Sequence, residues 1–249
     1  MRILRLSAVL LVSILAYRIC AGDEKGPDVP NAESAAGFFR LGENSMAHTW
    51  TIYYETIADK IDDRWKSFFD LAQKLGAPKQ TMDALAEVKK NLSALPLGKA
   101  YGQWTADEQK KFISFPSNAD PIFDWIKKPD YQALFYFDMG RLSLEGYFVI
   151  QKLVLDQGYS IDSYKSTIQA IGNDAEMCLT DTGFEAARKR LAPAALQILK
   201  DIRALKGKLD DPLGEGFTKD DVAKLAQLCK SLSTMARENK LLAEAEKPK

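Results

Sequence analysis

The stretch that decides the fold is FYFDMGRLSLEGYF, residues 135–148, because it repeats a phrase found much earlier in the chain. The earlier phrase is FFRLGENSMAHTW, residues 38–50. At an offset of 98 residues (140 − 42 = 98), the matching pairs are Phe39 with Phe137, Leu41 with Met139, Gly42 with Gly140, Ser45 with Ser143, and Met46 with Leu144. A phrase that recurs in this way indicates an internal duplication.

Further blocks follow these phrases in the same order in both halves of the chain. DRWKS at Asp63 corresponds to DSYKS at Asp162, and VKKNL at Val88 corresponds to ARKRL at Ala187. PLG and a capping segment also recur, with WTADEQKKF at 104–112 and FTKDDVAKL at 217–225. Similar amphipathic helices alone would produce some of these matches, but a shared order favours two tandem repeats.

The spacing of apolar residues predicts an all-α fold. In residues 50–75, Ile57, Ile61, Trp65 and Phe68 recur at intervals of three and four, which is the period of a helix with one buried face. Capping boxes, in which a hydroxyl and a carboxylate satisfy free backbone N–H groups, are predicted at three helix starts. The pairs are Thr105 with Glu108, Thr182 with Glu185, and Thr218 with Asp221. Each repeat should therefore hold roughly four helices, and the two repeats should pack as one bundle-like body related by a pseudo-two-fold axis.

The alignment also predicts the boundaries of the chain's segments. The offset rises from 99 to 116 residues late in the second repeat, so we expect a helix extension of 17 residues (116 − 99 = 17) near Pro193. The predicted segments are a signal peptide at 1–22, a flexible mature N-terminus at 23–37, repeat 1 at 38–115, a linker at 116–130, repeat 2 at 131–240 and a disordered tail at 241–249.

The N-terminus has the pattern of an export signal. Basic residues precede the apolar run LSAVLLVSILAY, and small residues near Ala21 offer a cleavage site. The run is short for a membrane span, although an uncleaved anchor is an alternative. Removal of the leader would leave 31 basic and 34 acidic residues, since Arg2, Arg5 and Arg18 would be lost (34 − 3 = 31). We therefore expect an exported protein, periplasmic or extracellular, with no nucleic-acid partner and with the membrane only as its export route.

Two cysteines, Cys178 and Cys229, would remain after cleavage. An even number of cysteines in an exported protein makes this pair a candidate disulfide. The alternative is two free, buried thiols.

Small residues in the repeated phrase form the most specific pattern. We expect the two opening helices to cross near Gly42 and Gly140, because glycine lets two backbones approach closely. Glycine inside a helix costs about 1 kcal/mol relative to alanine, so its presence in both repeats favours a packing role. A ligand pocket lined by the same positions is the alternative. The candidate positions are Gly42, Ser45, His48, Gly140, Ser143 and Gly146.

Little in the sequence indicates catalysis. His48 is the single histidine, which excludes metal sites with several histidines, and we expect no catalytic residue, metal or cofactor. Arg141 and Glu145 are four residues apart beside the glycine motif, a spacing typical of an ion pair within one helix.

We therefore expect a non-enzymatic protein that acts by binding, with an unknown protein partner in the periplasm or cell envelope. A carrier of an apolar small molecule or lipid between the repeats is the first alternative. A hydrolase that uses paired acids is the second alternative.

Overall fold

The structure is a computed structural model that describes residues 27–54, 58–96, 99, 103–114, 120–127, 131–158, 160–210 and 216–243. Within these residues the chain is predominantly helical and has no strand, which confirms the all-α prediction. In chain order the elements are α2 (Ala32–Tyr54), α3 (Ala58–Lys74), α4 (Lys79–Ser93), α5 (Ala106–Ser114), α6 (Asp120–Ile126), α7 (Gln132–Leu144), the π-helix η3 (Glu145–Asp156), the 3₁₀ turn η4 (Ile161–Tyr164), α8 (Lys165–Thr180), the 3₁₀ turn η5 (Thr182–Phe184), α9 (Glu185–Lys189), α10 (Pro193–Asp210) and α11 (Lys219–Arg237).

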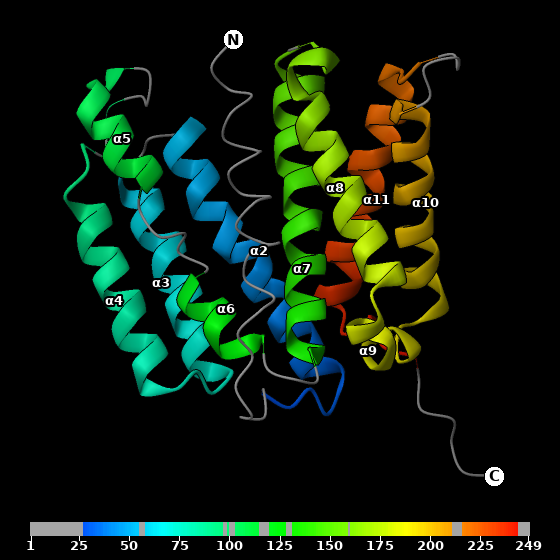
Figure 1. The fold of residues 1–249 in the computed structure, drawn as a ribbon, viewed down its shortest axis with the longest axis horizontal. Coiled ribbons are helices and arrows are strands. Elements are labelled where there is room, and N and C mark those ends of the chain that lie inside the picture. Colours follow the sequence, from blue (N-terminus) through cyan, green and yellow to red (C-terminus); the bar gives the residue numbers. More distant parts are fainter. Residues whose placement is uncertain are drawn as a thin grey trace.

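Helices α2 and α7 form the centre of the molecule (Figure 1). They pack against each other more extensively than any other pair of elements. Helix α3 packs on α2 and on α4, while α8 packs on α7 and on α10. Helix α11 contacts α7, η3, α10 and α2, so it closes the second half of the molecule around the central pair.

Helix α7 is buried on all sides. Ten of its 13 residues are buried, including Phe135, Tyr136 and Phe137 in succession. The ring of Phe137 meets that of Phe123 from α6 with centroids 5.2 Å apart, and the ring of Phe135 meets that of Phe184 from η5 at 5.3 Å. Because α7 has apolar residues on every side, a central position buries them all, together with Asp138 and Arg141.

The chain continues from α7 into the π-helix η3 at Glu145. π-Helical turns within longer helices are rare and are frequent at functional sites. The change of helix type falls between Ser143, whose hydroxyl donates to the carbonyl of Cys229 on α11 at 2.6 Å, and Gly146, which packs against the Cys229 side chain. Helix α11 thus holds the start of η3 closely.

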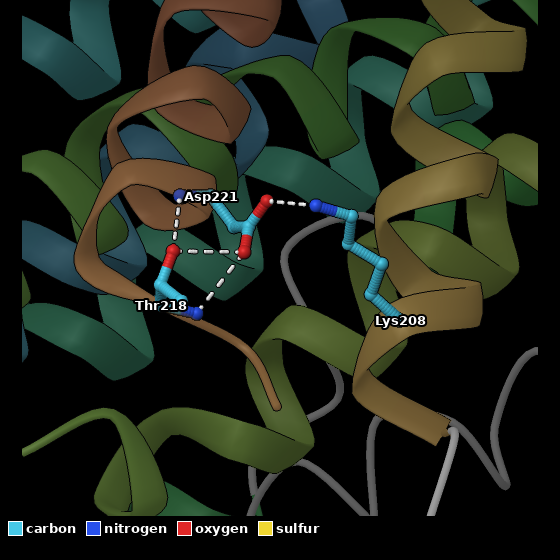
Figure 2. A network of polar contacts seen from close by, with 3 residues as sticks. All are labelled: Lys208, Thr218 and Asp221. Carbon is cyan, nitrogen blue, oxygen red and sulfur yellow. Dashed lines mark hydrogen bonds and ion pairs between the residues drawn. The ribbon is translucent and has the colours of Figure 1, made fainter. Parts of the chain in front are cut away.

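Two of the predicted capping boxes are confirmed. At the start of α5, the backbone N–H of Glu108 donates to the hydroxyl of Thr105 (3.3 Å), and the N–H of Thr105 donates to the carboxylate of Glu108 (2.7 Å). Thr218 and Asp221 form the same arrangement at the start of α11. Figure 2 shows that Lys208 of α10 reaches the same carboxylate, with its Nζ 2.8 Å from the Asp221 carboxylate oxygen.

The third predicted capping box is wrong. The side chain of Asp181 accepts from the N–H of Gly183 and begins the 3₁₀ turn η5 one residue earlier than expected. Glu185 instead pairs with Lys189 at 2.6 Å on the exposed surface of α9. Aspartate is a stronger cap than threonine, so the position before Thr182 takes that role.

The described part of the predicted flexible N-terminus is ordered. Helix α2 begins at Ala32, and Val29 is only 3% exposed. The guanidinium of Arg190 donates to the carbonyls of Val29 and Pro30 and so holds this segment on the second half of the molecule. The prediction of flexibility over 23–37 is therefore wrong for these residues, while residues 1–26, with the signal peptide and Ala21, lie outside the described part.

The predicted linker and tail also carry structure. Residues 120–126 of the linker form α6, and Ile122 and Ile126 are fully buried. Because these two apolar residues are four positions apart, a helix places both on the face that packs against the core. In the tail, Leu241 is buried and Leu242 forms an isolated bridge with Leu191. The disorder predicted for 241–243 is therefore wrong, and 244–249 lie outside the described residues.

The cap of α11 provides the first testable prediction. Thr218→Ala should lower the free energy of unfolding by about 1 kcal/mol, because the N–H of Asp221 would lose its acceptor. Thr218→Ser keeps the hydroxyl and should stay close to the natural protein. Denaturant unfolding of both variants measures the difference, and equal stability of the two would contradict a capping role for this hydroxyl.

Candidate functional site

Helices α2 and α7 touch backbone to backbone at the two repeated glycines. A Cβ atom placed on Gly42 would overlap the carbonyl oxygen of Phe137 and lie 2.9 Å from its carbonyl carbon. A Cβ atom placed on Gly140 would overlap the carbonyl oxygen of Phe39 and lie 2.8 Å from that carbonyl carbon. No residue other than glycine fits at either position without separation of the helices.

The two glycine contacts are reciprocal. Gly42 meets Phe137 and Gly140 meets Phe39, and an offset of 98 residues converts one contact into the other (137 − 39 = 98 and 140 − 42 = 98). The next nearest atoms obey the same exchange, since each Cβ would lie 3.1 Å from the backbone nitrogen of Arg141 or of Glu43. Close approach of this kind also permits weak Cα–H···O contacts, worth roughly 0.5–1 kcal/mol each.

The remaining candidate positions do not share one environment. The hydroxyl of Ser45 donates to the carbonyl of Gly42 in its own helix at 2.7 Å, whereas the hydroxyl of Ser143 donates across to α11. Gly146 faces α11, where a Cβ atom would lie 2.9 Å from the Cβ of Cys229. His48 lies in α2, but its side chain is outside the described part of the structure. The three glycines and Ser143 therefore lie at contacts between helices, whereas the Ser45 hydroxyl bonds within α2.

Cys178 and Cys229 are both buried and free, so the candidate disulfide is not formed. The negative charge of Asp138 acts on the Cys178 thiol, whereas Cys229 packs against Gly146 and is influenced by Glu145. The two thiols thus lie in different surroundings, on α8 and on α11.

Charged side chains gather where α7 and η3 face α8, and we call this cluster the polar seam. It consists of Asp138, Arg141 and Glu145 from α7–η3, and of Asp174 and Cys178 from α8. The spacing of three and four residues along α7–η3, and of four along α8, places the members of each set on one helix face. Asp138 and Arg141 are only 5% and 6% exposed, so these charges lie largely away from water.

Arg141 is the cation of the polar seam. Its Nη1 lies 3.8 Å from the carboxylate of Asp138, so the predicted ion pair with Glu145 is wrong and the partner is one turn earlier. The guanidinium carbon also lies over the ring of Phe123, 5.3 Å from its centroid. The Nε atom is buried without a hydrogen-bond partner. Stacking on Phe123 directs the guanidinium toward α6 and leaves its positive charge incompletely matched.

Two acids of the polar seam, Glu145 and Asp174, hold their protons more tightly than usual. Burial raises the pKa of Glu145 to about 7, with the nearby charge of Asp174 adding to the effect and Arg141 opposing it. Burial also raises the pKa of Asp174 to about 6, again against the influence of Arg141. Carboxyl groups with such pKa values exchange protons near neutral pH.

A third acid with a raised pKa, Glu43, is buried at the contact of α2 and α11. Burial raises its pKa, while a hydrogen bond with Ser233 and the charges of Arg237 and Arg40 lower it. Asp174 belongs to no recognisable motif, and Glu43 lies within the repeated phrase but is not one of its matched positions, so sequence reasoning missed both. Each of these acids occupies a helix position at which the 3.6-residue period would place an apolar residue. That irregularity can be recognised only once the buried face of the helix is known.

What the polar seam can do chemically is take up and release protons. Within the described residues, no group of three or more His, Cys, Asp and Glu side chains is arranged to hold a metal ion. Glu145 belongs to η3 and Asp174 to α8, two elements that contact each other, and both residues are half-buried. The two acids therefore belong to helices rather than to a loop.

The glycine crossing provides the second prediction. Gly42→Ala and Gly140→Ala should each lower the free energy of unfolding by roughly 3 kcal/mol or more, because the new methyl group meets a backbone carbonyl that cannot move aside. The two losses should be similar, since the contacts are reciprocal. Thermal or denaturant unfolding followed by circular dichroism measures both.

Gly207 in α10 is the matched control. It is exposed, and a Cβ atom there would have nothing within 4 Å. Gly207→Ala should therefore raise stability by up to about 1 kcal/mol through helix propensity alone. A Gly140→Ala protein as stable as Gly207→Ala would contradict the close crossing.

Comparisons with known proteins were made at three levels. The chain matches no protein-family model, no curated protein and no solved structure. Among the described residues, no helix is both long enough and apolar enough to cross a membrane.

Proposed function

We propose that this chain is an exported, non-catalytic helical protein that acts by binding another protein in the periplasm or cell envelope. The proposal is supported by the hydrogen bonds that interior polar side chains make between helices. Ser143 donates to a carbonyl of α11, Tyr136 donates to the carbonyl of Ala187 at 3.5 Å, and Arg190 binds the backbone that precedes α2. These groups join helices to each other, which is the pattern of a rigid framework that presents its outer faces.

We also propose that the framework is a tandem repeat with a pseudo-two-fold axis through the glycine crossing. The reciprocal contacts of Gly42 and Gly140 support such an axis, because a two-fold rotation exchanges equivalent atoms. The aligned blocks pair α2 with α7–η3, α3 with α8, and α5 with α11. Helix α10, which begins at Pro193, then corresponds to the predicted extension of the second repeat.

The outer surface offers one prominent apolar side chain among the described residues. Tyr147 on η3 is 37% exposed and is the large hydrophobic residue that stands out there. The Nζ of Lys230 lies over its ring, 5.6 Å from the centroid. Tyrosine beside a cation is a common element of protein interfaces, so Tyr147 is the first position to vary when a partner is sought.

Cross-linking in the native host tests the binding function. We expect a discrete cross-linked complex whose second component is identified by mass spectrometry and then purified. Tyr147→Ser should weaken binding to the purified partner about tenfold, the effect of removing an aromatic anchor. Lys189→Ser, on exposed α9, should leave the affinity unchanged. Absence of any saturable complex would contradict the proposal.

Native mass spectrometry separates the alternatives. A carrier should retain an apolar molecule as a constant added mass, whereas a protein-binding framework should show the mass of the chain alone. The same spectrum reports the leader, since removal of residues 1–22 leaves a chain that begins at Asp23. A retained lipid in every preparation would favour the carrier over the binding protein.

A further inference from the structure

Residues 190–192, which connect α9 to α10, bind both ends of the described chain, and we call this segment the clasp. The side chain of Arg190 binds the N-terminal end. Its Nη1 donates to the carbonyl of Val29 at 2.5 Å, and its Nη2 donates to the carbonyl of Pro30 at 3.1 Å. Figure 1 shows α9 and the start of α2 at the same end of the molecule. The guanidinium therefore fixes the path of the chain into α2.

The backbone of the clasp binds the C-terminal end. The N–H of Ala192 donates to the carbonyl of Leu241 at 2.8 Å, and the N–H of Ala243 donates to the carbonyl of Arg190 at 3.0 Å. These two bonds form an isolated antiparallel bridge, which is the one pairing of extended backbone among the described residues. The C-terminal end is therefore held by main-chain groups of the clasp.

The turn after α11 brings this end to the clasp. Asn239 adopts a left-handed conformation (φ 56°), and the N–H of Lys240 donates to the carbonyl of Met235 at 2.8 Å, which is the Schellman arrangement at a helix end. The next residue, Leu241, is fully buried. Two backbone bonds and the burial of this leucine hold residues 241–243, and so short a contact opens more easily than a whole helix.

Arg190 takes part in both contacts. Its carbonyl accepts from the C-terminal end, while its guanidinium donates to the N-terminal end. The same guanidinium donates to the side-chain oxygen of Gln132, the first residue of α7, at 2.8 Å. The reach of a side chain depends on the position of its own backbone. A shift of the Arg190 backbone, after loss of its bond with Ala243, therefore moves the guanidinium relative to Val29 and Pro30.

We propose that the clasp couples the two ends of the described chain, so that release of residues 241–243 also releases residues 29–30, and the reverse. This inference does not depend on the binding function proposed above. It rests on the hydrogen bonds that one residue makes to both ends and on the burial of Val29 and Leu241 beside those bonds. A molecule that binds either end therefore changes the exposure of the other.

Hydrogen exchange of the full chain tests the coupling from the C-terminal end. Ala243→Pro removes the N–H that donates to Arg190, and Ala243 is exposed, so the core is left intact. The amides of residues 31–35, at the start of α2, should then exchange about fivefold faster, which is the effect of losing one hydrogen bond. Ala243→Ser keeps the N–H and should exchange as the natural protein does.

A second substitution tests the coupling from the N-terminal end. Arg190→Lys keeps the backbone and the positive charge but removes the forked guanidinium that binds two carbonyls. The amides of Ala192 and Ala243 should then exchange about fivefold faster, although their own acceptors are unchanged. Arg203→Lys, at an exposed position of α10, should leave both amides as in the natural protein.

The two variants decide between coupled and independent ends. Substitutions that loosen only the end they touch would overturn the proposal. Helix α4, on the far side of the molecule from α9 in Figure 1, should keep its protection in both variants, which separates opening of the clasp from global unfolding.

A measurement on the natural protein needs no substitution. In low concentrations of denaturant, amides that open in one event share one free energy of exchange and one dependence on denaturant. We expect this agreement between Ala192 and Ala243 at one end and Ala35 at the other, whose N–H donates to the carbonyl of Asn31 at 3.1 Å. Unequal dependences at the two ends would overturn the proposal even if a variant does not fold.

Discussion

The backbone contact between α2 and α7 is the constraint on which the rest of the structure depends. At Gly42 and Gly140, a carbonyl of the opposing helix occupies the space that a Cβ atom would take in any other residue. With the helices so close, the aromatic residues on either side of the crossing have to pack outward against α6 and η5. Each half of the molecule then assembles around its own central helix, with α3 on α2 and α8 on α7.

Sequence patterns predict the elements of this fold better than their ends. The helical period and the caps at Thr105 and Thr218 are local signals, and the structure contains each of them. The order of the N-terminal segment, of α6 and of residues 241–243 comes from tertiary contacts, such as the Arg190 bonds to Val29. Such contacts leave no local pattern, and neither does the π-helical form of η3.

The candidate site divides in the same way. The glycine motif is visible in the sequence because both copies keep it, whereas the polar seam needs residues from two helices that only the fold brings together. Asp174 has no neighbour in sequence that marks it, and the partner of Arg141 is decided by stacking on Phe123 rather than by spacing. Spacing alone left the cysteine pairing open, and their places on α8 and α11 leave them unpaired.

The crossing also limits how this chain can diverge. At most close contacts, a larger side chain on one helix is tolerated when a smaller one appears opposite, so paired substitutions allow gradual change. Here the obstructing atoms belong to the main chain, which every amino acid shares. No second-site replacement can make room, and we therefore expect Gly42 and Gly140 to stay fixed in descendants of this protein while the surfaces around them vary freely.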